Sequence, residues 1–240
     1  MTCGPAISPT GDLAAFPLRG EAGTLRTWVE TRGWRKIVLC CGVIILGSGC
    51  YGAAMGWWRA PLQGGYVALK FPLIVLLTTF GNALLNGMLA PLLGVNISFR
   101  QSLSAILLSF AIASAILGSL SPLVAFVVWN APSVAGGGQS YLVHSFMLLL
   151  HVAIISFAGI TGNIHLKRML AAMTGNPVAA RRLLLAWLAG NLFLGSQVSW
   201  ILRPFIGSPG LPIAFFREDA LHGNFFETVA RSFLNLFNLN

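Results

Sequence analysis

The feature that most constrains this chain is a series of five long apolar runs separated by short polar segments. They cover residues 37–57, 71–93, 103–129, 141–164 and 183–202. A helix needs about 20 residues to cross roughly 30 Å of hydrocarbon, and each run is near that length. Backbone polar groups in lipid must be satisfied within the segment, which favours helices. The sequence therefore predicts an all-α, polytopic bundle of about five transmembrane helices.

The composition favours lipid over water as the surroundings of most of the surface. Only 9% of the 240 residues are charged and 56% are hydrophobic, whereas a soluble domain carries about 25% charged residues. The net charge is +9, but the basic residues lie between the apolar runs, as they do around membrane spans. We expect membrane lipids as partners and no nucleic acid.

Three segments are expected along the chain. Residues 1–35 form a polar, partly disordered tail, residues 36–203 form the five-span domain, and residues 204–240 form a surface turn and an amphipathic helix. In the last part, six apolar residues recur at helical spacing opposite polar ones: Phe225, Phe226, Val229, Phe233, Leu236 and Phe237. This pattern suits a helix lying in the membrane interface, and equally a helix packed on the protein's own loops.

The distribution of Lys and Arg predicts a cytoplasmic N-terminus, because cytoplasmic loops carry an excess of these residues. This orientation places the larger group inside: Arg19, Arg26, Arg32, Arg35, Lys36, Arg100, Lys167, Arg168, Arg181 and Arg182. The smaller group lies outside: Arg59, Lys70, Arg203, Arg217 and Arg231. We expect a multi-pass protein of a bacterial inner membrane.

All five apolar runs lack carboxylates, since no Asp or Glu occurs between Glu30 and Glu218. Proton relays in membranes commonly use Asp, Glu or His, and hydrolytic or transfer chemistry usually needs a carboxylate as a base or metal ligand. Glu218, Asp219 and Glu227 follow the last run, so they could serve this chemistry only at the outer face of the membrane. The sequence therefore predicts a protein that is not an enzyme and has no cofactor.

Small and amide residues within the runs predict helix packing. Gly52 and Gly56, four apart, give the first run a stripe for close helix approach. Amides are costly in hydrocarbon unless paired, so they should face the bundle interior: Asn82, Asn86, Asn191 and Gln197. They act either as contacts between helices or as the lining of a polar pathway, and the second alternative predicts a small channel or carrier.

Two histidines suggest a third alternative. His144 and His151 are seven residues apart in the fourth run, so they lie on one helix face about two turns apart. Imidazole is a common axial ligand of haem iron, and such a site would make the chain a haem-binding electron-transfer subunit. The other interpretation is that both histidines pack between helices through hydrogen bonds.

Three cations flank the second run and the start of the third. Arg59, Lys70 and Arg100 are predicted near the level of the lipid headgroups. They are interpreted either as anchors whose charged ends reach the interface or as contacts to an anion or lipid headgroup.

Two stretches resemble known membrane proteins. The five-span layout and the segment Phe99-Arg-Gln-Ser-Leu103, which leads into a run containing Pro122, resemble the Yip1-type membrane proteins over residues 37–202. This resemblance implies a non-enzymatic role in membrane organisation, with small GTPases as partners in eukaryotic members. The run from Gly195 to Pro209 is similar to one in uncharacterised bacterial membrane proteins, which implies no activity.

The leading hypothesis is a non-catalytic membrane protein that organises the bilayer or serves as an accessory subunit of a membrane complex. Its expected partners within the membrane are other proteins or further copies of itself. The channel and the haem-binding subunit are the alternatives.

Overall fold

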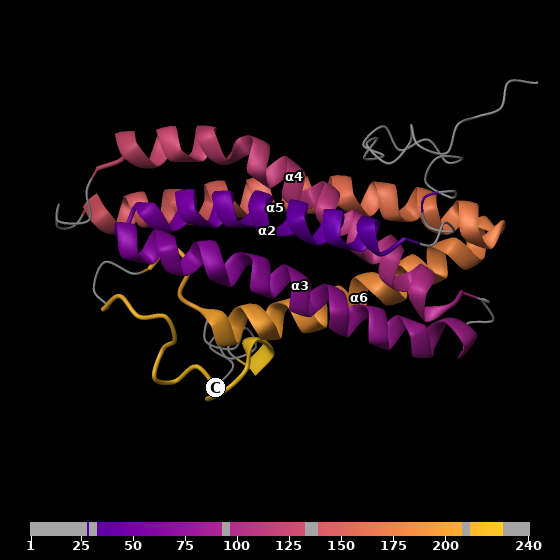
Figure 1. Cartoon of the computed structure of the whole chain (residues 1–240). Coiled ribbons are helices and arrows are strands. Elements are labelled where there is room, and N and C mark those ends of the chain that lie inside the picture. Colours follow the sequence, from indigo (N-terminus) through magenta and orange to yellow (C-terminus); the bar gives the residue numbers. More distant parts are fainter. Residues whose placement is uncertain (1–27, 29–32, 93–96, 133–138, 208–211, 228–240) are drawn as a thin grey trace, which may run out of the picture.

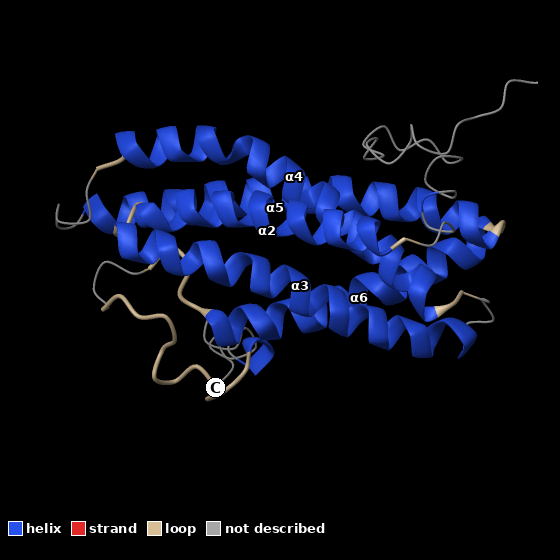
Figure 2. Ribbon diagram, viewed as in Figure 1, coloured by secondary structure: helices blue, strands red, loops and turns tan. Residues whose placement is uncertain are grey.

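The computed structural model describes residues 28, 33–92, 97–132, 139–207 and 212–227. These residues form helices and loops, with no strand among them (Figure 2). The long helices are α2 (Trp34–Trp57), α3 (Pro61–Leu92), α4 (Phe99–Asn130), α5 (Gln139–Thr174) and α6 (Pro177–Leu202). All five are long and apolar enough to cross a membrane. The predicted all-α bundle of five spans is confirmed, and the chain is a multi-pass membrane protein.

α4 and α6 begin before their predicted apolar runs, and a polar side chain caps each start. At the start of α4, the Ser98 hydroxyl accepts a bond from the Gln101 backbone N–H, and the Gln101 side chain accepts one from the Ser98 backbone N–H. At the start of α6, the Asn176 side chain caps the next turn and Pro177 occupies the first helical position. α3 begins at Pro61 instead of residue 71, and α5 ends at Thr174 instead of residue 164.

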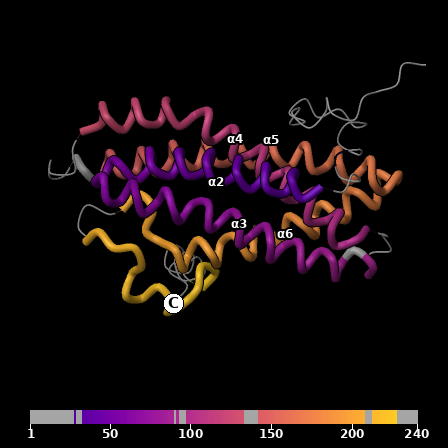
Figure 3. The backbone as a smooth tube through the Cα atoms, in the orientation of Figure 1, coloured from indigo at the N-terminus to yellow at the C-terminus, as the bar shows by residue number. Residues whose placement is uncertain are grey.

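The helices run in alternating directions along the bundle, as the colours of Figures 1 and 3 show. α2 packs against α3 and α4, α4 packs against α3 and α5, and α6 packs against α3 and α5. The end where α2, α4 and α6 finish is called the Trp58 end here and lies at the left of Figure 1. α5 and α6 lie together at the opposite end and separate toward the Trp58 end (Figures 1 and 3).

Close approach of α2 to its neighbours depends on glycine. A Cβ atom at Gly52 would lie 2.6 Å from the Val67 carbonyl oxygen, and one at Gly56 would lie 2.7 Å from the Gln63 carbonyl oxygen. Neither distance is tolerable for a methyl group, so α2 and α3 can pack this closely only without side chains there. The small-residue stripe thus packs within the chain, against α3, and is not a free surface for a second copy.

The buried core has two parts. One lies toward the Trp58 end and includes Tyr51, Met55 and Met147. The other lies toward the opposite end and includes Leu108 and Trp187.

The C-terminal amphipathic helix lies mostly outside the described residues. Residues 225–227 are helical, and the Asn224 side chain caps this turn by accepting a hydrogen bond of 2.8 Å from the Glu227 backbone N–H. Residues 228–240 are outside the described part, as is most of the predicted tail of residues 1–35.

Candidate functional site

The bundle contains an apolar cavity of about 530 Å³, within the range typical of ligand sites. All five helices and the segment that follows α6 contribute side chains to its wall. The lining residues include Met55 of α2, Phe71 and Val75 of α3, Phe110 and Leu117 of α4, His144, His151 and Gly159 of α5, Ser199 of α6, and Phe205 and Arg217 beyond it. This wall suits a ligand with a large apolar part.

The cavity is accessible from the side of the bundle. Leu148, Val152 and Ile155 line it and are also exposed at the surface of α5. Because these helices span a membrane, a molecule dissolved in lipid can reach the cavity without first entering water.

His151 of the cavity wall belongs to a buried pair of polar side chains. The Tyr51 hydroxyl oxygen and His151 Nδ1 lie 2.7 Å apart in a hydrogen bond between α2 and α5. Tyr51 is fully buried and His151 is 3% exposed. The two rings also meet edge to face, with centroids 5.6 Å apart. His151 Nε2, the other ring nitrogen, is buried and makes no hydrogen bond to the described residues.

His144 lies two turns before His151 and also lines the cavity. Its ring packs on Trp58 at a centroid distance of 5.8 Å, and its Nδ1 atom is buried without a hydrogen-bond partner among the described residues. The two histidines predicted from the sequence therefore share one cavity. The haem alternative stays a prediction, tested by Soret absorbance after expression with haem supplied.

Residues 203–207, called the return segment here, fold back from the end of α6 onto α3. Gln63 Nε2 donates hydrogen bonds to the carbonyl oxygens of Pro204 at 3.0 Å and Phe205 at 2.8 Å. Lys70 Nζ donates to the Pro204 oxygen at 3.1 Å. Since Pro204 and Phe205 line the cavity, these bonds fix one part of its wall.

The position of Lys70 differs from the predicted headgroup contact. The side chain is 0% exposed, and its Nζ lies 4.9 Å from the centre of the Phe215 ring. The reason is the early start of α3, which places Lys70 inside the helix and under the return segment. The Lys70 ammonium therefore contacts the Pro204 carbonyl and the face of the Phe215 ring instead of lipid headgroups. Both groups are favourable to a cation.

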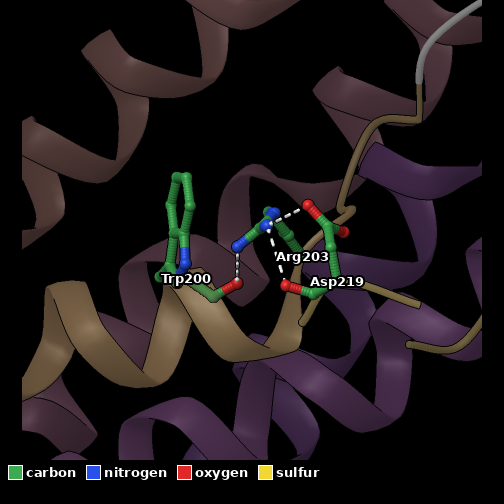
Figure 4. Close-up of polar contacts among 3 residues, drawn as sticks. All are labelled: Trp200, Arg203 and Asp219. Atoms are coloured by element: carbon green, nitrogen blue, oxygen red, sulfur yellow. Dashed lines mark hydrogen bonds and ion pairs between the residues drawn. The ribbon is translucent and has the colours of Figure 1, made fainter. Parts of the chain in front are cut away.

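The return segment is also fixed by Arg203, as Figure 4 shows. Its guanidinium packs over the Trp200 ring at 3.6 Å from the centroid and forms an ion pair of 2.9 Å with Asp219. Desolvation acts to raise the pKa of Asp219, but the hydrogen bond and charge of Arg203 outweigh it and lower that pKa below its ordinary value. Asp219 is therefore ionised at neutral pH.

Beside this ion pair lies a second cavity of about 490 Å³, called the polar pocket here. It is lined by Trp200, Arg203, Arg217, Asp219, His222, Gly223 and Glu227. Arg217 lines both the polar pocket and the apolar cavity, so the two share a wall.

The four predicted amides lie outside the apolar cavity and the polar pocket. Asn82 Nδ2 on α3 donates to the Asn191 side-chain oxygen and to the Trp187 carbonyl oxygen, both on α6. Asn86 is fully buried, and Gln197 is partly exposed on α6. The pair Asn82–Asn191 thus acts as a contact between helices.

The other two predicted cations occupy opposite ends of the bundle. Arg59 follows α2 and lies partly buried beside Gly207 of the return segment. Arg100 is exposed in the first turn of α4. Contact of Arg100 with a headgroup stays a prediction, and its exposed position permits it.

Among the described residues, no group of three His, Cys, Asp or Glu side chains is placed to hold a metal ion. Comparison with protein-family models, with curated proteins and with solved structures gives no match. The site is therefore interpreted from its own geometry.

Sequence reasoning missed Tyr51, Gln63 and Arg217 as site residues. One signal was available for Gln63, since it lies seven residues before Lys70, a spacing that puts both on one helix face. For Tyr51 the sequence gives no sign of its partner, because the hydrogen bond joins residues 100 positions apart.

Proposed function

We propose that the protein binds an amphipathic membrane lipid and contributes to membrane organisation through that binding, without catalysis. The observation that carries this proposal is the position of Arg217 in the wall of both cavities. The apolar cavity suits the hydrocarbon part of a lipid, and the polar pocket, with two arginines and two carboxylates, suits its headgroup.

The chemistry of the walls supports binding over reaction. No carboxylate occurs in the chain between Glu30 and Glu218, so the part of the apolar cavity formed by the five helices offers no acidic general acid or base. Its polar groups are two histidines and a few hydroxyls among many apolar side chains. A few polar groups in an apolar wall are typical of sites that orient a ligand.

The test is a substitution that fills the apolar cavity with a larger side chain, at a position where the structure leaves room for one. Gly159 lines the cavity, and a Cβ atom there meets nothing within 4 Å. We expect Gly159→Leu to reduce the lipid that copurifies with the protein in mild detergent, measured by native mass spectrometry. The matched control is Gly65→Leu on α3, where a Cβ atom also meets nothing and which lies outside the cavity wall.

Equal lipid retention by both variants and the unmodified protein would count against the proposal. Retention lost in both would indicate general damage, so the thermal unfolding midpoint of each variant is measured alongside. Loss in Gly159→Leu alone, with an unchanged midpoint, supports the cavity as the lipid site.

A second candidate, an accessory subunit of a membrane complex, is favoured by the outer faces of α5 and α6. These two spans bury the smallest share of their residues, and Phe146, Leu149 and Phe157 of α5 are exposed. Such faces contact either lipid or the helices of a partner. Affinity purification from native membranes with mass spectrometry tests this candidate, and a monomer that crosslinks to nothing would exclude it.

A further inference from the structure

We infer that His151 selects lipids that carry a carbonyl oxygen in their apolar part, by donating a hydrogen bond from Nε2. This inference rests on the proposed function and names the ligand chemistry of the same site. It also gives Tyr51 a role, because Tyr51 is a positioning residue that sets which nitrogen of His151 carries the proton.

The proton arrangement follows from the donors and acceptors of the pair. A neutral imidazole has one N–H donor and one acceptor nitrogen, and a tyrosine hydroxyl has a single hydrogen to donate. If Tyr51 donates to Nδ1, its hydrogen is used and Nε2 carries the imidazole proton. If Nδ1 donates instead, the Tyr51 hydrogen is left without an acceptor in a fully buried place. The first arrangement satisfies more groups and leaves a free N–H at Nε2.

A buried N–H without an acceptor is costly, and His151 has no acceptor at Nε2 among the described residues. The cavity wall to which it belongs is mostly apolar and includes Met55, Phe71 and Ala158. The described residues supply no partner and Nε2 is buried, so a ligand oxygen in the cavity becomes the acceptor when the ring turns Nε2 toward it. An uncharged acceptor suits this place, because an ion would lose its hydration among these apolar side chains.

A carbonyl oxygen is the acceptor that lipids place next to their apolar parts. It occurs in the acyl esters of glycerolipids and in the ring of isoprenoid quinones. Both sources share the same chemistry, an uncharged sp² oxygen attached to a hydrocarbon body, and the experiment distinguishes them.

The experiment compares ligands that differ only in their carbonyl oxygens. Dioleoylglycerol and its diether analogue have the same chains and the same headgroup, but the diether lacks both carbonyls. The intact protein in detergent is mixed with equal amounts of the two, and native mass spectrometry counts the bound molecules. We expect the diester to be favoured roughly tenfold, the size of one hydrogen bond. Decylubiquinone, added as a competitor, tests the ring carbonyl as the source.

Variants assign the preference to His151. In His151→Phe we expect both lipids to bind with the preference lost, because the ring is kept and the donor removed. Tyr51→Phe keeps His151 but removes the hydroxyl that fixes the imidazole proton on Nε2, so the preference should weaken. His144→Phe, at the other histidine of the cavity, should keep it.

The outcomes separate the two proposals. Equal binding of diester and diether to the unmodified protein would overturn the inference and leave lipid binding intact. Binding of neither lipid nor quinone would overturn both. A preference that survives in His151→Phe would also overturn the assignment to this residue.

Discussion

At the scale of single residues, three buried polar side chains of α3 donate to backbone carbonyls of other elements. Asn82 donates to the Trp187 oxygen, Gln63 to those of Pro204 and Phe205, and Lys70 to that of Pro204. A carbonyl oxygen has two lone pairs, so that of Trp187, within α6, can accept from Asn82, whereas those of Pro204 and Phe205 lie beyond the end of the helix. The buried Lys70 amine and the N–H groups of the Gln63 amide thus find acceptors in a membrane core that holds no carboxylate.

The first prediction concerns the glycine contacts of α2. We expect Gly52→Ala to destabilise the protein by about 1–3 kcal/mol, the usual cost of overpacking, because the new methyl group would meet the Val67 carbonyl oxygen. The measurement is thermal unfolding in detergent. Gly42→Ala on the same helix is the control, since a Cβ atom there meets nothing within 4 Å; equal effects of the two changes would contradict the packing.

The second prediction concerns the ion pair of Arg203 and Asp219. The folded protein lowers the pKa of Asp219, so the pair contributes stability above the ordinary carboxyl pKa and loses it as the pH falls through the lower folded value. We expect Asp219→Asn to reduce the unfolding midpoint slightly at pH 7, because exposed pairs contribute little. The difference between variant and unmodified protein should shrink when the pH falls below the ordinary pKa of about 3.9. A constant difference would contradict this origin.

At the scale of elements, α3 connects the parts of the bundle. One half holds the return segment through Gln63 and Lys70, and the other half holds α6 through Asn82. Asn82 also lies against Gly190 of α6, where a Cβ atom would meet its side-chain oxygen. α3 therefore positions both the end of α6 and the cavity wall that follows it.

The third prediction tests this connection. Gln63→Leu removes two hydrogen bonds to the return segment, which contribute about 0.5–1.5 kcal/mol each. We expect faster hydrogen–deuterium exchange in residues 203–207 and weaker lipid retention, because Pro204 and Phe205 line the apolar cavity. Gln197→Leu, at a partly exposed position of α6, is the control. Unchanged exchange in Gln63→Leu would show that Lys70 and Arg203 fix the segment without Gln63.

The positions of the five helices could be predicted from the sequence, but most of the contacts between them could not. Apolar length located five spans, because hydrocarbon thickness sets the length of a helix. The same criterion missed the first turns of α3, where Gln63, Gly64 and Gly65 lower the hydropathy, and so placed Lys70 at the membrane surface. The pairing of Tyr51 with His151 depends on the relative rotation of α2 and α5. The packing of both helices on α4 sets this rotation, and hydropathy carries no information about it.

At the scale of the whole molecule, five crossings put the two ends of the spanning domain on opposite sides of the membrane. The Lys and Arg distribution predicts a cytoplasmic N-terminus, which places the Trp58 end, and with it both cavities, on the outer side. A lipid would then enter from the outer leaflet.

The fourth prediction tests this orientation in intact cells with a membrane-impermeant thiol reagent, on variants in which the native cysteines are replaced. We expect Leu221→Cys, exposed near the Trp58 end, to be labelled. Lys167→Cys, exposed near the opposite end, should be labelled only after the membrane is made permeable. The reverse pattern would show that the N-terminus faces outward.

The bond between Lys70 and the Pro204 carbonyl has a consequence for biogenesis. Synthesis proceeds from the N-terminus, so α3 leaves the ribosome well before residue 204 exists. During that interval the amine of Lys70 and the amide of Gln63 lack the acceptors they have in the finished protein. The half-made chain therefore needs water, headgroups or the insertion machinery around these side chains until the last helix arrives.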